Sequence, residues 1–244
     1  MTAAKPIAIF SNGAVHRERP AFRAACGGEW DAVFGGALEQ PAAIFEHFDI
    51  EGGAQLPAPD RFAGIVLTGS SAMITQRHPW AEAEADWVRR HRDSVPMLGV
   101  CFGHQMLTHA LGGEVGWVPS GPQFGTIDVE LTDAVLADPL FSGLGRTMKV
   151  QVGNSQAALR LPGDATRLAD GAGGIMAARF GARTWGLQFH PELTPAMLRA
   201  LLADYTDHYT ANGRIPATEL LAGLAETPAA VTVLRRFVAL CQGG

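Results

Sequence analysis

The chain has 244 residues, of which 47% are hydrophobic and 18% charged, with a net charge of −5 and an isoelectric point near 5.9. This length suits one large domain or a domain with an appendage, and the composition excludes a disordered or fibrous protein. Because Lys and Arg are scattered along an acidic chain, we expect no nucleic-acid partner.

Signals for a membrane, a disulfide framework or a metal are weak throughout the sequence. No stretch approaches the roughly 18 apolar residues of a spanning helix, and the N-terminus does not resemble a signal peptide. Cys26, Cys101 and Cys241 are far apart and odd in number, which favours a reducing compartment. The eight histidines and three cysteines show no metal-site spacing. We therefore expect a cytoplasmic protein with no metal, no other cofactor and no membrane contact.

Short apolar runs alternate with amphipathic segments in the first half of the chain. One such segment, Pro79–Arg92, has proline in its first turn and arginines near its end, as is typical of a helix. Strands that alternate with helices imply a parallel sheet covered on both faces, so the fold class is α/β. The predicted strands are Pro6–Phe10, Ala42–Phe48, Gly64–Thr68 and Met97–Val100.

After Gly113 the pattern changes to strand-like pieces with few helices. This half indicates a mixed or antiparallel extension of the same sheet. The predicted strands here are Phe124–Leu131, Met148–Val152, Gly174–Phe180 and Thr184–Phe189.

The chain returns to helix at Thr194, which we predict to cap a helix that ends at Asn212-Gly213. Two shorter helices are expected near Thr218–Ala225 and Ala229–Leu240, with no chemistry of their own. We expect a main domain at 1–193 and a helical extension at 194–244 packed on the same domain. The sequence leaves open whether these helices cover the sheet or form the face of a homodimer.

The most informative segment is an apolar strand that runs into Gly-x-Cys-x-Gly at Gly99–Gly103 and then into a helix from about Phe102 to Leu111. Flanking glycines allow a sharp turn with Cys101 at its apex, where a helix N-terminus favours the reactive thiolate. The backbone N–H of Phe102 would then face a developing oxyanion. The alternative is a buried apolar cysteine, which is the better interpretation for Cys26 and Cys241.

A second segment, Trp185–Glu192, is an alternating strand that delivers His190 and, two residues later, Glu192. A cysteine nucleophile needs a base, and that base needs a partner to fix its tautomer. Pro191 disfavours helix at His190, so the two side chains can converge. We therefore predict a Cys101–His190–Glu192 triad rather than a structural histidine. His104 follows Cys101 on the same helix but lacks an adjacent carboxylate, so we expect a structural role for it.

Together the segments Gly99–Gln105 and Gln188–Glu192 resemble the two signatures of the class I (triad) glutamine amidotransferases, and most of all the glutaminase domain of GMP synthases. The resemblance runs from about Pro6 to Glu192. It implies a flavodoxin-like three-layer fold and a cysteine that attacks the side-chain amide of glutamine, releases ammonia and leaves a thioester for hydrolysis.

The resemblance also assigns roles to residues outside the triad. It implies a second oxyanion N–H from the Gly69-Ser70 turn and a contact of Gln105 with the amino-acid end of the substrate. Ser70 stands where the family commonly has glycine. Asn154, beside Ser155, replaces a histidine that often contacts glutamine, which leaves the γ-glutamyl substrate open. A helix cap at Asn154-Ser155 is the alternative interpretation.

Three functions fit these residues. The first is a free-standing hydrolase of glutamine or another γ-glutamyl compound, such as a γ-glutamyl peptide or amine. The second is a glutaminase subunit that passes ammonia to a separate synthetase, because the sequence has no Gly-x-x-x-x-Gly-Lys-Ser/Thr phosphate loop. The third is a catalytically silent binding or regulatory protein of the same fold, against which the complete triad argues.

Overall fold

One sheet of nine strands dominates the computed structural model, which describes residues 4–13, 19–210 and 216–243. The first five strands of the sheet are parallel, and the other four pair antiparallel. From one edge to the other the strands are β2 (Phe45–Asp49), β1 (Ile7–Ser11), β3 (Gly64–Leu67), β4 (Met97–Val100), β11 (Thr184–Leu187), β10 (Gly174–Arg179), β9 (Thr166–Gly171), β6 (Gln123–Leu131) and β7 (Thr147–Asn154). The predicted α/β class and the antiparallel addition are confirmed.

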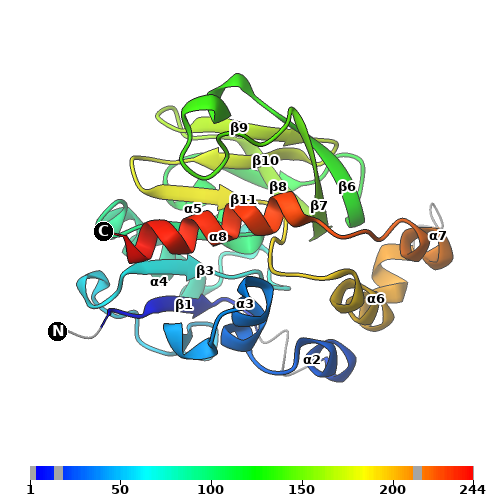
Figure 1. Ribbon diagram of the computed structural model, residues 1–244, viewed down its shortest axis with the longest axis horizontal. Coiled ribbons are helices and arrows are strands. Elements are labelled where there is room, and N and C mark those ends of the chain that lie inside the picture. Colours follow the sequence, from blue (N-terminus) through cyan, green and yellow to red (C-terminus); the bar gives the residue numbers. More distant parts are fainter. Residues whose placement is uncertain (1–3, 14–18, 211–215, 244) are drawn as a thin grey trace.

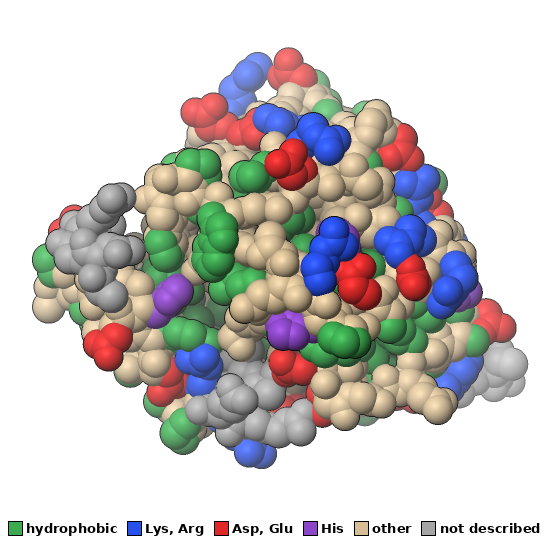
Figure 2. Space-filling model, turned by 180° about the vertical axis from the view of Figure 1, so that it is seen from behind, with side chains coloured by type: hydrophobic (Ala, Val, Ile, Leu, Met, Phe, Trp, Pro, Cys, Tyr) green, Lys and Arg blue, Asp and Glu red, His purple; other side chains and the backbone are tan. Residues whose placement is uncertain are grey.

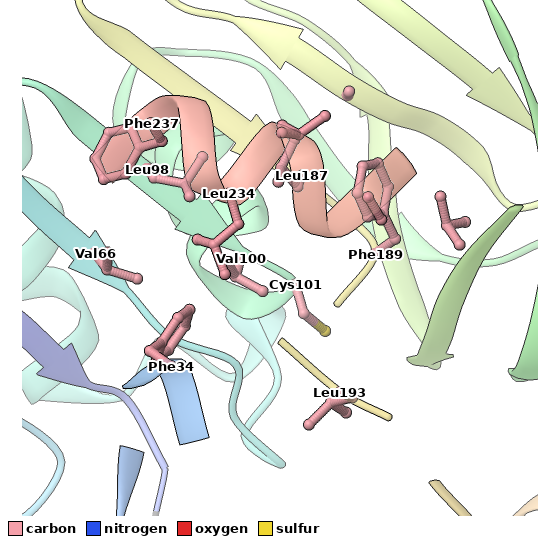
Figure 3. Close-up of a cluster of buried hydrophobic side chains, with 14 of the residues drawn as sticks. Phe34, Val66, Leu98, Val100, Cys101, Leu187, Phe189, Leu193, Leu234 and Phe237 are labelled. Carbon is pink, nitrogen blue, oxygen red and sulfur yellow. The ribbon is translucent and has the colours of Figure 1, made fainter. Parts of the chain in front are cut away.

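Helices cover both faces of this sheet (Figure 1). α3 (Trp30–Leu38) and α8 (Pro228–Gln242) lie on one face, and α4 (Pro79–His91) and α5 (Phe102–Ala110) lie on the other. Strand side chains alternate between the two cores, so Ile9 packs under α3 and α8 while Phe10 packs under α4. Figure 3 shows the first core, where side chains of β3, β4 and β11 meet Phe34 of α3 and Leu234 of α8.

The remaining elements lie at the carboxyl ends of the parallel strands. β5 (Glu114–Trp117) and β8 (Gln156–Arg160) form a separate antiparallel pair that packs against α5 and β10. α2 (Pro20–Cys26) and α6 (Pro195–Thr210) lie side by side, and α7 (Ala217–Ala222) follows α6 (Figure 1). The amide of Met197 donates to Thr194 Oγ1 at 3.2 Å, which confirms the predicted cap. The predicted helix end at Asn212-Gly213 lies outside the described residues.

The prediction for Ala42–Phe48 is wrong in its first half. Residues Ala42–Ile44 form a turn of 3₁₀ helix, closed by a hydrogen bond from the Ile44 amide to the carbonyl of Pro41 at 3.2 Å. The strand begins at Phe45 because its neighbour β1 begins at Ile7, the partner of Phe45 in the register. Residues before Phe45 therefore have no strand beside them. The sequence patterns also did not predict α2, α3, β5, β8 or β9.

Charged side chains of both signs lie close together on the face shown in Figure 2, where the described residues form no extended patch of one sign. Ion pairs such as Arg77–Glu82 at 3.1 Å and Arg92–Asp164 at 2.9 Å join several of the charged groups in the molecule. None of the described helices combines the length and apolar character that a bilayer span requires.

A methyl group at Gly103 should destabilise the protein. An ideal Cβ there would lie 2.3 Å from the carbonyl oxygen of Leu67, so helix α5 would have to move off β3. We expect Gly103→Ala to lower the free energy of unfolding by about 1–3 kcal/mol in urea titrations. The matched control is Gly36→Ala on the exposed side of α3, where a Cβ meets nothing within 4 Å. That change should raise stability by about 0.5–1 kcal/mol. Equal stability of the two variants would contradict the close approach.

Candidate active site

Cys101 occupies a strained turn between β4 and α5. Its φ of 52° and ψ of −103° lie in a region of backbone conformation that usually requires glycine, although Cys101 has a Cβ. The amide of Cys101 donates to the carbonyl of Leu187 at 2.7 Å, so the turn stays attached to the neighbouring strand β11. This is the conformation of a nucleophile elbow, in which the side chain is presented at the end of a strand. Figure 3 shows the sulfur pointing out of the packed core.

The two flanking glycines are required by close backbone contacts. An ideal Cβ at Gly99 would lie 2.4 Å from the carbonyl oxygen of Gly103, and one at Gly103 would meet Leu67 as described above. Both distances are shorter than real Cβ contacts allow. The structure therefore leaves no room for a Cβ at either glycine, and the first turn of α5 packs closely against β3 and β4.

His190 and Glu192 lie beside this turn. His190 Nδ1 is 2.6 Å from Glu192 Oε1, and the amide of His190 donates to the carbonyl of Gln151 on β7 at 2.8 Å. An ideal Cβ at Gly69 would lie 3.0 Å from His190 Cε1 and 3.6 Å from Cys101 Cβ, so all three residues converge. Glu192 is 1% exposed. The structure thus brings together the three residues that the sequence predicts to be nucleophile, base and orienting carboxylate.

The electrostatics of this group favour a charged imidazole. Burial by itself would lower the pKa of His190, but the Glu192 and Cys101 charges, with hydrogen bonds to both, raise it well above its ordinary 6.5. The His190 ring is therefore held in its charged form beside Glu192 and Cys101.

The loop after β3 lies against the same side chains. The Oγ1 of Thr68 accepts from the Asn12 amide at 3.0 Å and donates to the carbonyl of Gly69 at 3.1 Å, which fixes the loop next to β1. Ser70 is absent from the described non-glycine residues with positive φ, and its Oγ accepts from the Ala72 amide at 2.9 Å. Serine therefore fits this position without backbone strain. The Phe102 amide starts α5 and has no intrahelical acceptor.

Three predicted substrate residues also lie at this site. Gln105 Nε2 donates to the carbonyl of Gln156 at 2.6 Å and to Gln188 Oε1 at 3.1 Å. Gln188 in turn lies 3.6 Å from Cys101 Sγ. Asn154 ends β7, and Ser155 hydrogen-bonds to His208 Nε2 on α6 at 2.9 Å. The alternative of a helix cap at Asn154-Ser155 is wrong, because strands and not a helix flank this turn.

A cavity of about 380 Å³ opens beside Cys101. Three side-chain amides that line it, Gln105, Asn154 and Gln156, are called the amide wall. Five rings that also line it, Phe22, Trp30, Tyr205, His208 and Tyr209, are called the aromatic wall. Arg19, Leu193 and the Gly69-Ser70 loop also line the cavity. Sequence patterns gave no sign of the aromatic wall, because its members come from α2, α3 and α6 and only the fold brings them together.

Other reactive side chains are buried away from this cavity. His104 is fully buried against Phe180, and burial lowers its pKa to about 4, so it stays neutral. Burial raises the pKa of the Cys26 and Cys241 thiols to about 12. Among the described residues, no group of three or more His, Cys, Asp or Glu side chains is arranged to hold a metal ion.

Comparison with known proteins places these residues in a family. The family model for glutamine amidotransferase class-I matches residues 50–204, which include all three members of the triad. The chain belongs to the class I glutamine amidotransferases. Solved structures support the same fold: a glutamine amidotransferase from Thermotoga maritima has a TM-score of 0.74 at 19% identity, covering 98% of this chain and 99% of its own. One from Methylobacillus flagellatus has a TM-score of 0.77 at 20% identity, covering 98% and 96%.

Curated relatives of this amidotransferase domain are named GMP synthase (glutamine-hydrolyzing). The protein from Aeropyrum pernix is 39% identical over 135 residues, which cover 54% of this chain and 25% of the relative. The protein from Thermomicrobium roseum is 32% identical over 139 residues, which cover 57% and 25%. The match thus spans about a quarter of the length of these relatives.

Replacement of Glu192 should lower the pKa of His190. In the wild-type protein, we expect NMR titration of the His190 ring to give a midpoint well above 6.5, and in Glu192→Gln a lower one, because the neighbouring charge is lost. The pKa of His190 is thus higher in the folded protein than in the unfolded chain. The His190–Glu192 pair therefore stabilises the fold fully below about pH 6.5, and this stabilisation is lost as pH rises through the folded-state pKa of His190. His104, held neutral by burial, serves as the internal control and should not respond. An unchanged His190 midpoint would show that Glu192 does not act on the ring.

Proposed function

We propose that the chain hydrolyses a γ-glutamyl amide through a thioester on Cys101. The observation that carries this proposal is the convergence of Cys101 and the His190–Glu192 pair, joined at 2.6 Å, with the Gly69 loop at one end of a cavity. A nucleophile, a base with its orienting group and oxyanion donors are the parts that acyl transfer requires.

In the first half of the reaction, the Cys101 thiolate attacks the γ-carbonyl carbon of the substrate. The amide N–H of Phe102 and an N–H of the Gly69-Ser70 turn stabilise the oxyanion. The imidazolium of His190 donates its proton to the leaving nitrogen as the carbon–nitrogen bond breaks. Neutral His190 then takes a proton from water, whose oxygen attacks the thioester and releases γ-carboxylate and thiolate. Glu192 stabilises the imidazolium in both halves.

Replacement of the nucleophile tests this mechanism directly. We expect Cys101→Ala to lower the release of glutamate from glutamine and other γ-glutamyl compounds by at least about 10³-fold, because no thioester can form. Cys26→Ala is the matched control, since Cys26 is a buried thiol whose pKa of about 12 keeps it protonated. Coupled glutamate and ammonia assays give both rates. Activity retained in Cys101→Ala would favour a catalytically silent role for the triad and refute the proposal.

The intermediate itself should be detectable. Acid quenching during turnover, followed by mass spectrometry, should show one γ-glutamyl group added to the peptide that contains Cys101. The adduct should accumulate more in Glu192→Gln if the orienting carboxylate assists hydrolysis of the thioester. An adduct on any other residue would contradict the assignment of Cys101.

A second candidate function is that of a glutaminase subunit that supplies ammonia to a separate synthetase. It is favoured by the curated relatives, which are named GMP synthase and match the chain over a quarter of their length. The two functions differ in what limits the rate. An autonomous hydrolase turns over alone at its full rate, whereas a subunit is slow alone and accelerates when its synthetase is added.

A further inference from the structure

The cavity beside Cys101 is larger than glutamine needs, and its lining contains more kinds of side chain than glutamine can contact. Its volume of about 380 Å³ falls in the range of about 300–1,000 Å³ typical of sites for drug-sized ligands. The leaving group of glutamine is ammonia, which has no apolar surface with which to fill the aromatic wall. The side chains that line the cavity therefore indicate which amine portion the substrate carries.

The amide wall offers hydrogen-bond acceptors without donors. Asn154 Oδ1 and Gln156 Oε1 are buried and have no hydrogen-bond partner among the described residues. Their amide nitrogens are already used: Asn154 donates to the carbonyl of Gln156 at 3.0 Å, and Gln156 donates to Thr75 Oγ1 at 2.6 Å. Buried acceptors normally have a donor from the protein, from water or from a ligand. Asn154 and Gln156 both line the cavity, so the α-ammonium of a γ-glutamyl group can supply that donor when their oxygens turn toward it.

Three rings of the aromatic wall contact one another. The ring centroid of Tyr209 lies 6.0 Å from that of Tyr205 and 4.8 Å from that of His208, and the Tyr205 and His208 centroids are 6.2 Å apart. α2, which carries Phe22, packs against α6, which carries these three rings. Leu193, three residues after His190, lines the same cavity. His190 would deliver the proton to the leaving nitrogen and lines the same cavity as these rings, so the aromatic wall is available to the amine portion of a substrate.

Arg19 adds a positive charge at the edge of the aromatic wall. Its Cζ lies 3.2 Å from the ring centroid of Tyr205, which orients the guanidinium by stacking. Among the described residues no carboxylate pairs with Arg19, its Nε has no acceptor, and no Asp or Glu lines the cavity. A planar guanidinium that has no carboxylate partner among the described residues suits a carboxylate of the ligand.

Building on the proposed function, we propose that the preferred substrate is a γ-glutamyl amino acid whose second residue is aromatic or large and apolar. The amide wall binds the α-ammonium of the γ-glutamyl group. The aromatic wall binds the side chain of the second residue, and Arg19 binds its carboxylate. Hydrolysis would then release glutamate and the free second amino acid, whose amine nitrogen takes the proton from His190.

Four substrates test the side-chain and carboxylate contacts separately. γ-Glutamyl-phenylalanine has both groups, γ-glutamyl-glycine lacks the aromatic side chain, and γ-glutamyl-phenethylamide lacks the carboxylate. L-Glutamine lacks both. We expect kcat/KM to be highest for γ-glutamyl-phenylalanine and at least about tenfold lower for each of the two truncated compounds. Glutamine should be the poorest of the four. If glutamine is hydrolysed best, the inference is overturned while the proposed thioester chemistry stands.

Arg19→Gln tests the carboxylate contact. The preference for γ-glutamyl-phenylalanine over γ-glutamyl-phenethylamide should fall from about tenfold or more to about one, because only the first has the carboxylate. Arg23→Gln is the matched control, since Arg23 lies on the same stretch of chain but pairs with Glu29 at 3.5 Å outside the cavity. It should leave the preference unchanged. An equal preference in wild type and Arg19→Gln would refute the role of Arg19.

A binding measurement keeps this inference distinct from the proposed chemistry. Calorimetry with Cys101→Ala should show that γ-glutamyl-phenylalanine binds more tightly than glutamine and that a further Arg19→Gln change weakens this binding. Binding without turnover in the wild-type chain would support the assigned substrate class and refute autonomous hydrolysis. Absence of binding would overturn the inference.

Discussion

The structure depends on one constrained turn, in which a cysteine with a φ of 52° joins a buried strand to a helix. The strain is sustained because the backbone on each side is fixed: the Cys101 amide is bonded to β11, and Gly99 and Gly103 let α5 approach β3 and β4 more closely than any other residue would allow. The same contacts that strain Cys101 also place β11 beside it, and the chain that leaves β11 carries His190, the predicted base. The strain at Cys101 and the position of His190 thus have a common origin in the packing of three short strands.

The sequence predicts those parts of the fold whose signals are local. Met97–Val100 is apolar and bounded by a turn, so its strand is predicted with the observed bounds, and the two glycines of the elbow mark its end. The triad is predicted because a cysteine elbow and a His-Pro-Glu segment each carry their own chemistry. The first half of Ala42–Phe48 is predicted wrongly, since the start of an edge strand is set by its neighbour β1 and not by its own residues.

Other features could not be predicted because they exist only between distant segments. α3 contains Gly35 and Gly36 and shows weak periodicity, so its helical character depends on the strands it covers. Arg19 and Tyr205 stack although 186 positions separate them, and Ser155 meets His208 across 53. No spacing along the chain encodes such pairs. Sequence patterns therefore locate the candidate triad but not the aromatic wall of the cavity beside it.

The triad spans the boundary between the two halves of the sheet: Cys101 belongs to the parallel half, whereas the amide of His190 is tied to β7 in the antiparallel half. The lining of the cavity draws on helix α5, the β7–β8 turn and the helices α2, α3 and α6. Most of this lining belongs to segments other than the strained elbow. Under the proposed function, variation confined to the β7–β8 turn and to α2 and α6 would change which substrate fits the cavity, while the backbone of the elbow would be inherited intact.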